Sequence, residues 1–227
     1  MNSLKPYILA IDSSTSIMRI GLTLSDCEMV RCESDDRFRH AEFIFELVDS
    51  LLSEHGLDKK RLRLIVVSTG PGSFTGLRVG MAAAKGLAMS LEIPIVGVSS
   101  FRAAAGRIYR EFGKTGMLIR SRRDEYYAGI IDGPEFNEKY IQVLRTDKLA
   151  SHLAEVKVLG IDFDTGTLNF TDDKVIDPNR FSIEIEDFIL AGMKQMELSG
   201  PADMMVLEPL YIQTFPAGGK NAGRSIK

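Results

Sequence analysis

Apolar residues in the first half of the chain follow two spacings, which predict strands and helices in turn. Short apolar or alternating runs are typical of strands, whereas apolar residues three and four positions apart indicate helices. By these patterns we expect strands at 7–11, 18–24, 29–33, 64–67 and 93–98, and helices at 40–55, 75–89 and 99–112. The resulting order, β-β-β-α-β-α-β-α, predicts an α/β fold in which helices pack on a mixed sheet.

The second half of the chain has weaker periodicity. Two strands joined by a charged turn are expected first, at 117–119 and 125–131. They are followed by a short helix, a strand, a helix and an extended segment, at 148–155, 156–161, 183–196 and 204–212. From Pro216 onward the chain is rich in glycine and basic residues, so we expect disorder there.

The length of 227 residues is enough for one large core or for two subdomains that share an interface. Since both halves are rich in strands, we expect two related subdomains. We place them at 1–104 and 105–215, followed by a flexible tail at 216–227.

The composition argues against several classes of protein. A net charge of −3 gives no reason to expect strong general attraction to nucleic acid or to a membrane. No apolar run approaches the roughly 20 residues that span a bilayer, and the first residues lack the pattern of a signal peptide. Two cysteines, Cys27 and Cys32, are too few for a disulfide framework and are interpreted as free thiols. We therefore expect a cytoplasmic protein.

The glycine-rich stretch at residues 68–89 is the most informative part of the sequence. Gly70, Gly72 and Gly76 form a turn that leads into a helix, where free N–H groups favour an anion. The Gly-Lys-Ser/Thr ending of a phosphate loop is absent, however, and the first basic residue, Arg78, already lies inside the helix. We therefore favour a tight packing turn over a phosphate site.

The helix that follows this turn carries small residues at every fourth position, which places them on one face. Such a face allows another helix to approach closely, and its apolar flanks add contact area. Burial against the chain's own sheet is the alternative. We predict a partner interface formed by this helix and the helix at 40–55, with the residues Gly76, Leu77, Gly80, Met81, Ala84, Ala88, His40, Ile44 and Leu47.

Asp12 stands at the end of the first predicted strand and is followed by serine and threonine residues. An acidic residue in this position can hold a metal–phosphate group, or it can form a turn that satisfies its own backbone. We favour the turn, and keep Asp12, Ser14 and Gly72 as weak candidates for cofactor binding.

Neither a metal site nor a nucleophile stands out. The three histidines, His40, His55 and His152, are far apart in the sequence, and neither cysteine has a visible base nearby. We therefore predict no catalytic residue, no metal and no cofactor.

Six arginines gather on the helix at 99–112 and on the hairpin after it: Arg102, Arg107, Arg110, Arg120, Arg122 and Arg123. Such a group can bind RNA or an acidic partner, or it can be a solvated face with the acids that lie between its members. The sequence leaves both interpretations open.

The chain resembles the TsaB (YeaZ) family, whose members take part in threonylcarbamoyladenosine synthesis on tRNA. The most specific match is the run Gly-Pro-Gly-Ser-Phe-Thr-Gly-Leu-Arg-Val-Gly at 70–80. The resemblance extends from about residue 7 to 127, and returns briefly near the end of the chain. Further matching segments lie at 8–15, 40–42, 86–88, 94, 97–99 and 208–211.

The resemblance implies the fold of actin, Hsp70 and sugar kinases (the ASKHA fold), with two related subdomains. It also implies a catalytic partner, the TsaD-type transferase, together with a TsaE-type ATPase. Where TsaD proteins carry two metal-binding histidines, this chain has Ser100 and Ala104. Where the wider superfamily has a glycine in its phosphate turn, this chain has Ser14. The family's Ile-Asp-Ala-Arg segment is also changed, because Arg120 replaces the acid.

These features together predict a non-catalytic scaffold subunit that binds and activates a TsaD-type transferase. Alone, it is expected to form a homodimer through the same helices, with indirect or weak tRNA contact and no membrane contact. The alternative is a small ATP-binding phosphotransferase or ATPase that uses Asp12 and the turn at 70–76. A peptidase is a third hypothesis, against which the missing histidine pair argues.

Overall fold

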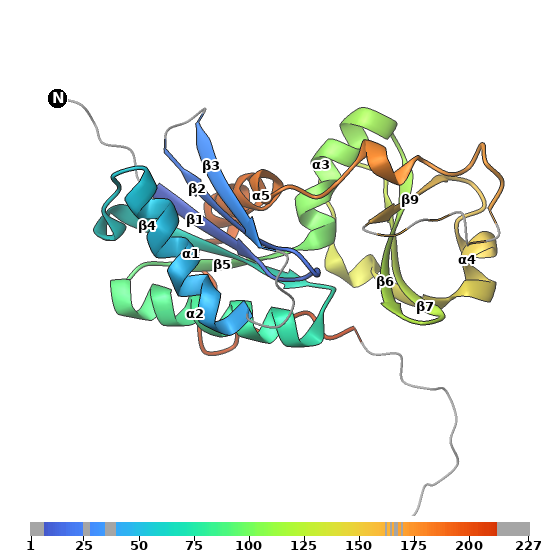
Figure 1. Ribbon diagram of the computed structural model, residues 1–227. Coiled ribbons are helices and arrows are strands. Elements are labelled where there is room, and N and C mark those ends of the chain that lie inside the picture. The colour runs from blue at the N-terminus through green and yellow to red at the C-terminus, as the bar shows by residue number, and fades with distance from the viewer. Residues whose placement is uncertain are drawn as a thin grey trace, which may run out of the picture.

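The computed structural model describes residues 7–24, 28–34, 40–161, 163, 165, 168 and 170–212, and the side chains of residues 40–42 are not described. Two sheets, each flanked by helices, make up the molecule (Figure 1). This arrangement is that of an ASKHA-like fold, as the sequence predicts. The expected tail at 216–227 lies outside the described residues.

The first sheet has five strands in the order β3-β2-β1-β4-β5. Strands β1, β2 and β3 form an antiparallel meander, and β4 and β5 run parallel to β1. The bounds are β1 Tyr7–Asp12, β2 Met18–Thr23, β3 Met29–Ser34, β4 Leu62–Gly70 and β5 Ile95–Ser99. All five were predicted, with ends that differ by a few residues.

Helices cover both faces of this sheet, because the central strands are apolar on both sides. Leu9, Ile11 and Ile65 face α1 (His40–Glu54) and α2 (Phe74–Leu91). The alternate positions, such as Ala10 and Val66, face α3 (Ser100–Phe112) and α5 (Ile185–Ser199). The sheet is thus the middle layer of three.

The second sheet has four strands in the order β8-β7-β6-β9. Strands β6 and β7 form the predicted hairpin, and β9 runs parallel to β6. The bounds are β6 Thr115–Arg122, β7 Glu125–Ile131, β8 Gln142–Arg145 and β9 Lys157–Ile161, and the short helix α4 spans Thr146–His152. Strand β8 was missed, because its four residues show no apolar run.

The segment at 204–212 is not a strand, which corrects the prediction of extended structure there. It begins with a turn and then runs past the edge of the first sheet. Two backbone hydrogen bonds hold this part of the chain, from Ala202 N–H to the Ile95 carbonyl and from Leu210 N–H to the Thr69 carbonyl. Because the two bonds are isolated, no ladder forms.

Helix α5 follows the second sheet in sequence but packs on the first. The cluster of buried side chains is therefore continuous from Val66 and Val96 through Phe101 and Phe188 to Met117 in the second sheet. The boundary near residue 104 stays a prediction. No helix in the described part of the chain is long and apolar enough to cross a membrane.

Candidate functional site

Three residues that the sequence singled out for cofactor binding meet in one cleft. It has a volume of about 230 Å³ and lies where β1 ends, between the first turns of α2 and α3 and strands β6 and β9. Its lining includes Asp12, Ser14, Arg19, Gly72, Ser73, Ser100, Ile119, Arg120 and Ile161.

The carboxylate of Asp12 is buried and already has partners within the chain. Its Oδ1 accepts the Ser14 N–H at 3.0 Å, and its Oδ2 lies 3.5 Å from Nη1 of Arg19. Arg19 also contacts Glu33, again at 3.5 Å. Asp12 therefore closes a turn and pairs with a buried cation, which agrees with the turn interpretation.

Sequence reasoning missed Arg19, although the strand pattern contained the signal. In the β1–β2 hairpin Asp12 lies directly opposite Arg19. Opposite charges that face each other across an antiparallel pair attract. Pairing the two predicted strands would therefore have placed this guanidinium beside the carboxylate.

The glycine turn packs tightly against the loop that follows β1. A Cβ on Gly72 would overlap the Ser14 carbonyl oxygen, and the same oxygen accepts the Ser73 N–H at 2.7 Å. Ser73 then caps α2 by accepting the Gly76 N–H at 3.2 Å. This geometry agrees with a packing turn, since the Ser73 N–H at the helix start already has a partner.

The small-residue face of α2 lies against the chain's own sheet rather than on the surface. A Cβ on Gly76 would overlap the Ser13 carbonyl oxygen, and one on Gly80 would overlap the Ser13 hydroxyl. The Ser13 hydroxyl in turn donates to the Gly76 carbonyl at 2.8 Å. This is the close approach that the small residues allow, made between a helix and a loop of the same chain.

Most of the predicted interface residues lie inside the folded chain. Six of the nine are buried on the inner side of α2, namely Gly76, Leu77, Gly80, Met81, Ala84 and Ala88. Ile44 is fully buried in the same core, Leu47 is partly buried, and the side chain of His40 is outside the described residues. The folded chain itself covers these six and Ile44, and their role in a partner interface stays a prediction.

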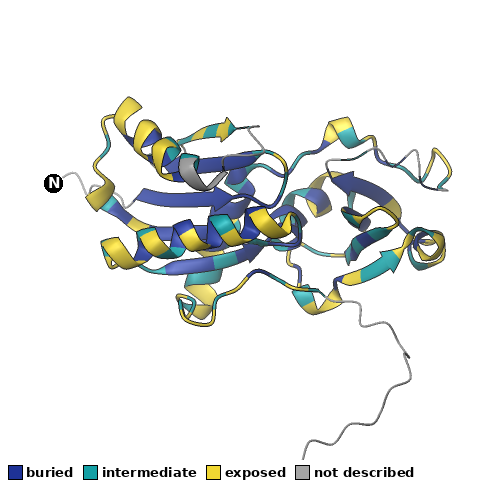
Figure 2. Ribbon diagram, turned by 60° about the horizontal axis from the view of Figure 1, so that its bottom comes forward, coloured by how far each residue is buried: buried dark blue, intermediate teal, exposed yellow. Residues whose placement is uncertain are grey.

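The opposite face of α2 is open and also has small residues. Figure 2 shows exposed positions along the outer sides of α1 and α2, on the near side of the buried sheet. We call the group of Phe45, Val79, Ala82, Gly86 and Met89 the outer surface. Met89 is 67% exposed and Phe45 46%, and a Cβ on Gly86 would meet nothing within 4 Å. A second helix could therefore approach α2 closely here.

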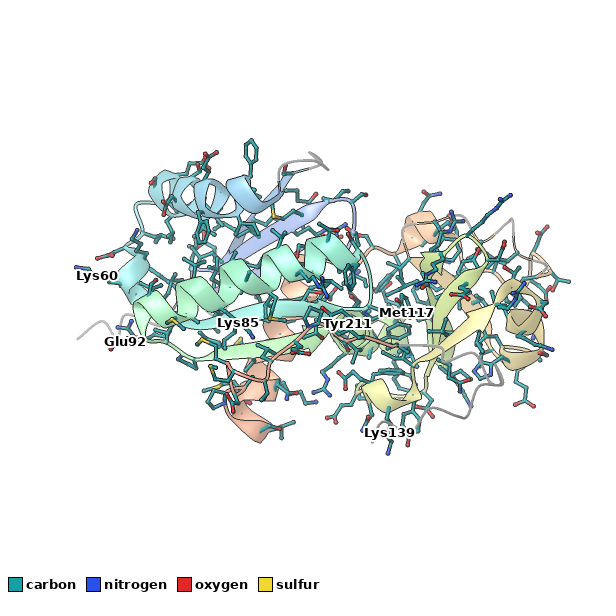
Figure 3. The ribbon with its side chains drawn as sticks, turned by 90° about the horizontal axis from the view of Figure 1, so that it is seen from below. Lys60, Lys85, Glu92, Met117, Lys139 and Tyr211 are labelled. Carbon is teal, nitrogen blue, oxygen red and sulfur yellow. The ribbon has the colours of Figure 1, made fainter. Side chains whose placement is uncertain are left out.

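An aromatic and cationic cluster lies at the start of α2. The guanidinium of Arg78 lies 3.8 Å from the centre of the Phe74 ring, and its Nε donates to the Tyr211 hydroxyl at 3.0 Å. Phe74 and Tyr211 are 54% and 42% exposed. In Figure 3, Tyr211 and Glu92 mark opposite ends of the helix, with Lys85 between them. Exposed Tyr and Arg side chains of this kind are frequent in protein interfaces.

The six arginines do not form one patch. Arg102 pairs with Glu138 at 2.6 Å, and Arg107 pairs with Asp187 at 2.6 Å. Both pairs link α3 to neighbouring segments. Arg120, Arg122 and Arg123 are exposed on the hairpin, where Arg120 reaches the cleft.

The pair of Arg107 and Asp187 ties α3 to the start of α5. Burial raises the pKa of the Asp187 carboxyl, while hydrogen bonds from Arg107 and from the Glu184 N–H favour its ionised form. The pair therefore has a structural role within the helix layer.

Comparisons with known proteins agree with the fold and with the sequence motifs. A family model described as TsaD, tRNA N6-adenosine threonylcarbamoyltransferase, matches residues 37–162. The chain is 36% identical to the tRNA threonylcarbamoyladenosine biosynthesis protein TsaB of Bacillus subtilis over 123 residues, which are 54% of this chain and 54% of that protein. It is 34% identical to TsaB of Escherichia coli over 122 residues, 53% of this chain and 52% of that protein.

The matched segments thus span about half the length of these curated relatives. The solved structure of YeaZ from Pseudomonas aeruginosa superposes with a TM-score of 0.74 at 22% identity, covering 91% of this chain and 100% of that one. At this identity the superposition shows the shared fold alone.

Proposed function

Since the chain belongs to the TsaD (tRNA N6-adenosine threonylcarbamoyltransferase) family, with TsaB proteins among its relatives, we propose that it acts in threonylcarbamoyladenosine synthesis on tRNA. In this proposal it is a non-catalytic subunit that binds and activates a TsaD-type transferase. A TsaE-type ATPase joins the assembly, and contact with tRNA is indirect or weak.

The outer surface is the observation that carries this proposal. Phe45, Ala82, Gly86 and Met89 combine apolar area with room for close helix approach. None of these four side chains carries a charge, which lowers the cost of removing water, and Glu46, Asp49 and Lys85 lie beside them on the two helices. Two helices from a partner can pack on α1 and α2 to form a four-helix contact.

The non-catalytic role is supported by what lies at the positions expected for catalysis. The resemblance places the metal-binding histidines of TsaD proteins at Ser100 and Ala104, neither of which is a metal ligand of that kind. The Asp12 carboxylate is paired with Arg19 inside the chain.

Self-association follows from the same surface. An apolar, self-complementary helix pair can form an isologous dimer when the catalytic partner is absent. We therefore propose that the homodimer and the complex with the transferase use overlapping areas of α1 and α2. The two assemblies then exclude each other.

The test places a large charge on the outer surface without disturbing the core. Gly86→Arg should not lower the unfolding temperature and should raise it slightly, because a side chain there points into open space and arginine favours a helix more than glycine does. Binding to a co-expressed TsaD-type transferase, measured by calorimetry, should weaken at least about 100-fold, since a charge is buried without a partner. Formation of threonylcarbamoyladenosine in tRNA by the mixture should fall with it.

Ser151→Arg on α4 is the matched control, because it adds the same charge at an exposed helical position beside the second sheet. It should bind as the unmodified chain does. If Gly86→Arg binds the transferase with unchanged affinity, the outer surface is not the interface. If the unmodified chain shows no binding and no effect on tRNA modification, the proposed function itself is overturned.

A further inference from the structure

A buried hydroxyl without a partner points to a second property of the cleft. Ser100 is the first residue of α3 and is only 2% exposed. Its Oγ is one of two buried side-chain oxygen or nitrogen atoms in the described part of the chain that make no hydrogen bond. Since a buried hydroxyl without a partner is costly, its presence on the lining of a cleft suggests a ligand.

The cleft also brings two cations near this hydroxyl. Arg19 is buried, and its contacts with Asp12, Thr15 and Glu33 are long, at 3.3–3.5 Å. Arg120 is exposed at the rim, with its guanidinium 5.2 Å from the centre of the Phe163 ring. No acidic side chain is paired with Arg120 among the described ion pairs.

The start of α3 adds donors that suit an anion. Ser99 caps the helix by accepting the Arg102 N–H at 3.1 Å, which leaves the first two N–H groups of the helix without intrahelical partners. The positive end of the helix dipole lies at the same point. Residues that carry hydroxyl, backbone N–H and guanidinium donors therefore line one small space.

We propose that this cleft binds a small oxyanion of the size of inorganic phosphate. Arg120 and Arg19 supply charge, and the Ser100 hydroxyl and the first turn of α3 supply hydrogen bonds. Asp12 is the one carboxylate on the lining, and its oxygens already face the Arg19 guanidinium and the Ser14 N–H. Glu33 also contacts Arg19 from outside the lining, so Arg120 is the arginine of the cleft without an acidic partner among the described ion pairs.

The size of the cleft selects against a nucleotide. Sites for ligands of that size are usually about 300–1,000 Å³, whereas this cleft has about 230 Å³. The glycine turn also argues against a nucleotide. Gly72 packs against the Ser14 carbonyl, so this turn does not wrap around a phosphate chain as a phosphate loop does. A single tetrahedral anion is the ligand that fits.

Thermal unfolding in sodium phosphate, compared with sodium chloride at equal ionic strength, tests this site. The unfolding temperature should rise with phosphate and saturate, since a ligand that binds only the folded state stabilises it. Arg120→Gln should weaken phosphate binding about tenfold, because it removes one charged donor. Arg122→Gln, an exposed arginine on the same strand that does not line the cleft, should leave it unchanged.

A second variant shows whether the Ser100 hydroxyl binds the ion or only lacks a hydrogen-bond partner. Ser100→Ala should raise the unfolding temperature in chloride, because it removes a buried hydroxyl that has no partner. It should also lose most of the further rise that phosphate causes in the unmodified chain. Chemical shifts of the Ser100 and Ser14 amides during the titration locate the ion in the same experiment.

Three outcomes would overturn the proposal. The first is an equal unfolding temperature in phosphate and chloride. The second is an equal loss in Arg120→Gln and Arg122→Gln, which would mean general attraction by surface charge. The third is a larger rise with magnesium and ATP than with phosphate at the same concentration, which would make the cleft a nucleotide site.

Discussion

The two faces of α2 are built from similar residues but meet very different surroundings. The inner face, with Gly76, Gly80, Ala84 and Ala88, packs against the loop after β1 and against the sheet. The outer face, with Ala82 and Gly86, meets open space. Small residues therefore allow close packing inside the chain on one face and, in the proposed interface, close approach from outside on the other.

This difference shows that a stripe of small residues on a helix does not by itself identify what packs against it. The periodicity of four identifies the inner face correctly as a contact face. What contacts it depends on Ser13, whose carbonyl and hydroxyl occupy the space beside Gly76 and Gly80. An arginine at Gly80 would therefore test folding rather than partner binding.

Gly76→Ala should have the largest effect on the isolated chain. The added Cβ would overlap a backbone oxygen, so the loop or the helix must shift. We expect a loss of about 3 kcal/mol in the free energy of unfolding, at the upper end for overpacking. Urea denaturation measures it. A loss below about 0.5 kcal/mol would show that the inner face is loosely packed.

The rate of cysteine modification should differ by about 100-fold between the inner and outer sides of the helix layer. Cys32 packs against the core beneath α1 and α2, and burial, with the charges of Glu54 and Glu33, raises the pKa of its thiol to about 11. In a Cys27→Ser background, Cys32 should react slowly with a disulfide reagent at pH 8. A cysteine introduced by Ala82→Cys should react fast, since an exposed thiol has a pKa near 8.5.

The pH dependence of these rates gives the control. The rate of Cys32 should keep rising up to about pH 11, whereas the rate of the introduced cysteine should level off above about pH 9. Because folding raises this pKa, the stability from the neutral thiol is present below about pH 8.5 and is lost as the pH rises to about 11. Equal rates at pH 8 would contradict the burial of Cys32.

Phe74→Ala should weaken binding of the transferase about tenfold while it changes the stability of the chain by less than about 1 kcal/mol. The ring is more than half exposed, yet it packs beside Arg78 and Tyr211 where the outer surface meets the start of α2. Calorimetry with the transferase measures the first effect and urea denaturation the second. Unchanged affinity would mean that the interface does not extend from the outer surface to Phe74.

Gly86→Ala should have the smallest effect, and it should have the opposite sign from Gly76→Ala. An alanine in an exposed helix interior is better by about 0.5–1 kcal/mol than a glycine. The free energy of unfolding should therefore rise by that amount, because nothing lies within 4 Å of the new methyl group. The measurement uses a dilute chain, so that the proposed homodimer has dissociated. A loss of stability under these conditions would mean that the chain itself covers the outer face.

Local patterns predict most of the elements, because the strands and helices of the first half are long and strongly apolar. Local patterns do not predict the four residues of β8 or the irregular path at 204–212, since both depend on neighbours supplied by distant segments. The same limit applies to the site. The residue types at Asp12, Ser14 and Gly72 mark the cleft, but its charge depends on Arg19 and Arg120, which come from two different sheets.

Helix α5 has a consequence for how the chain folds as it is made. The far face of the first sheet is covered only in part, by α3, until residues 185–199 have been synthesised, because α5 covers the rest and Gly192 lies directly on Val66. The first 104 residues alone would leave apolar positions such as Ala10 and Val66 in water. We therefore expect the first sheet to complete its packing only after α5 has been made, and a nascent chain stalled before α5 to expose apolar surface.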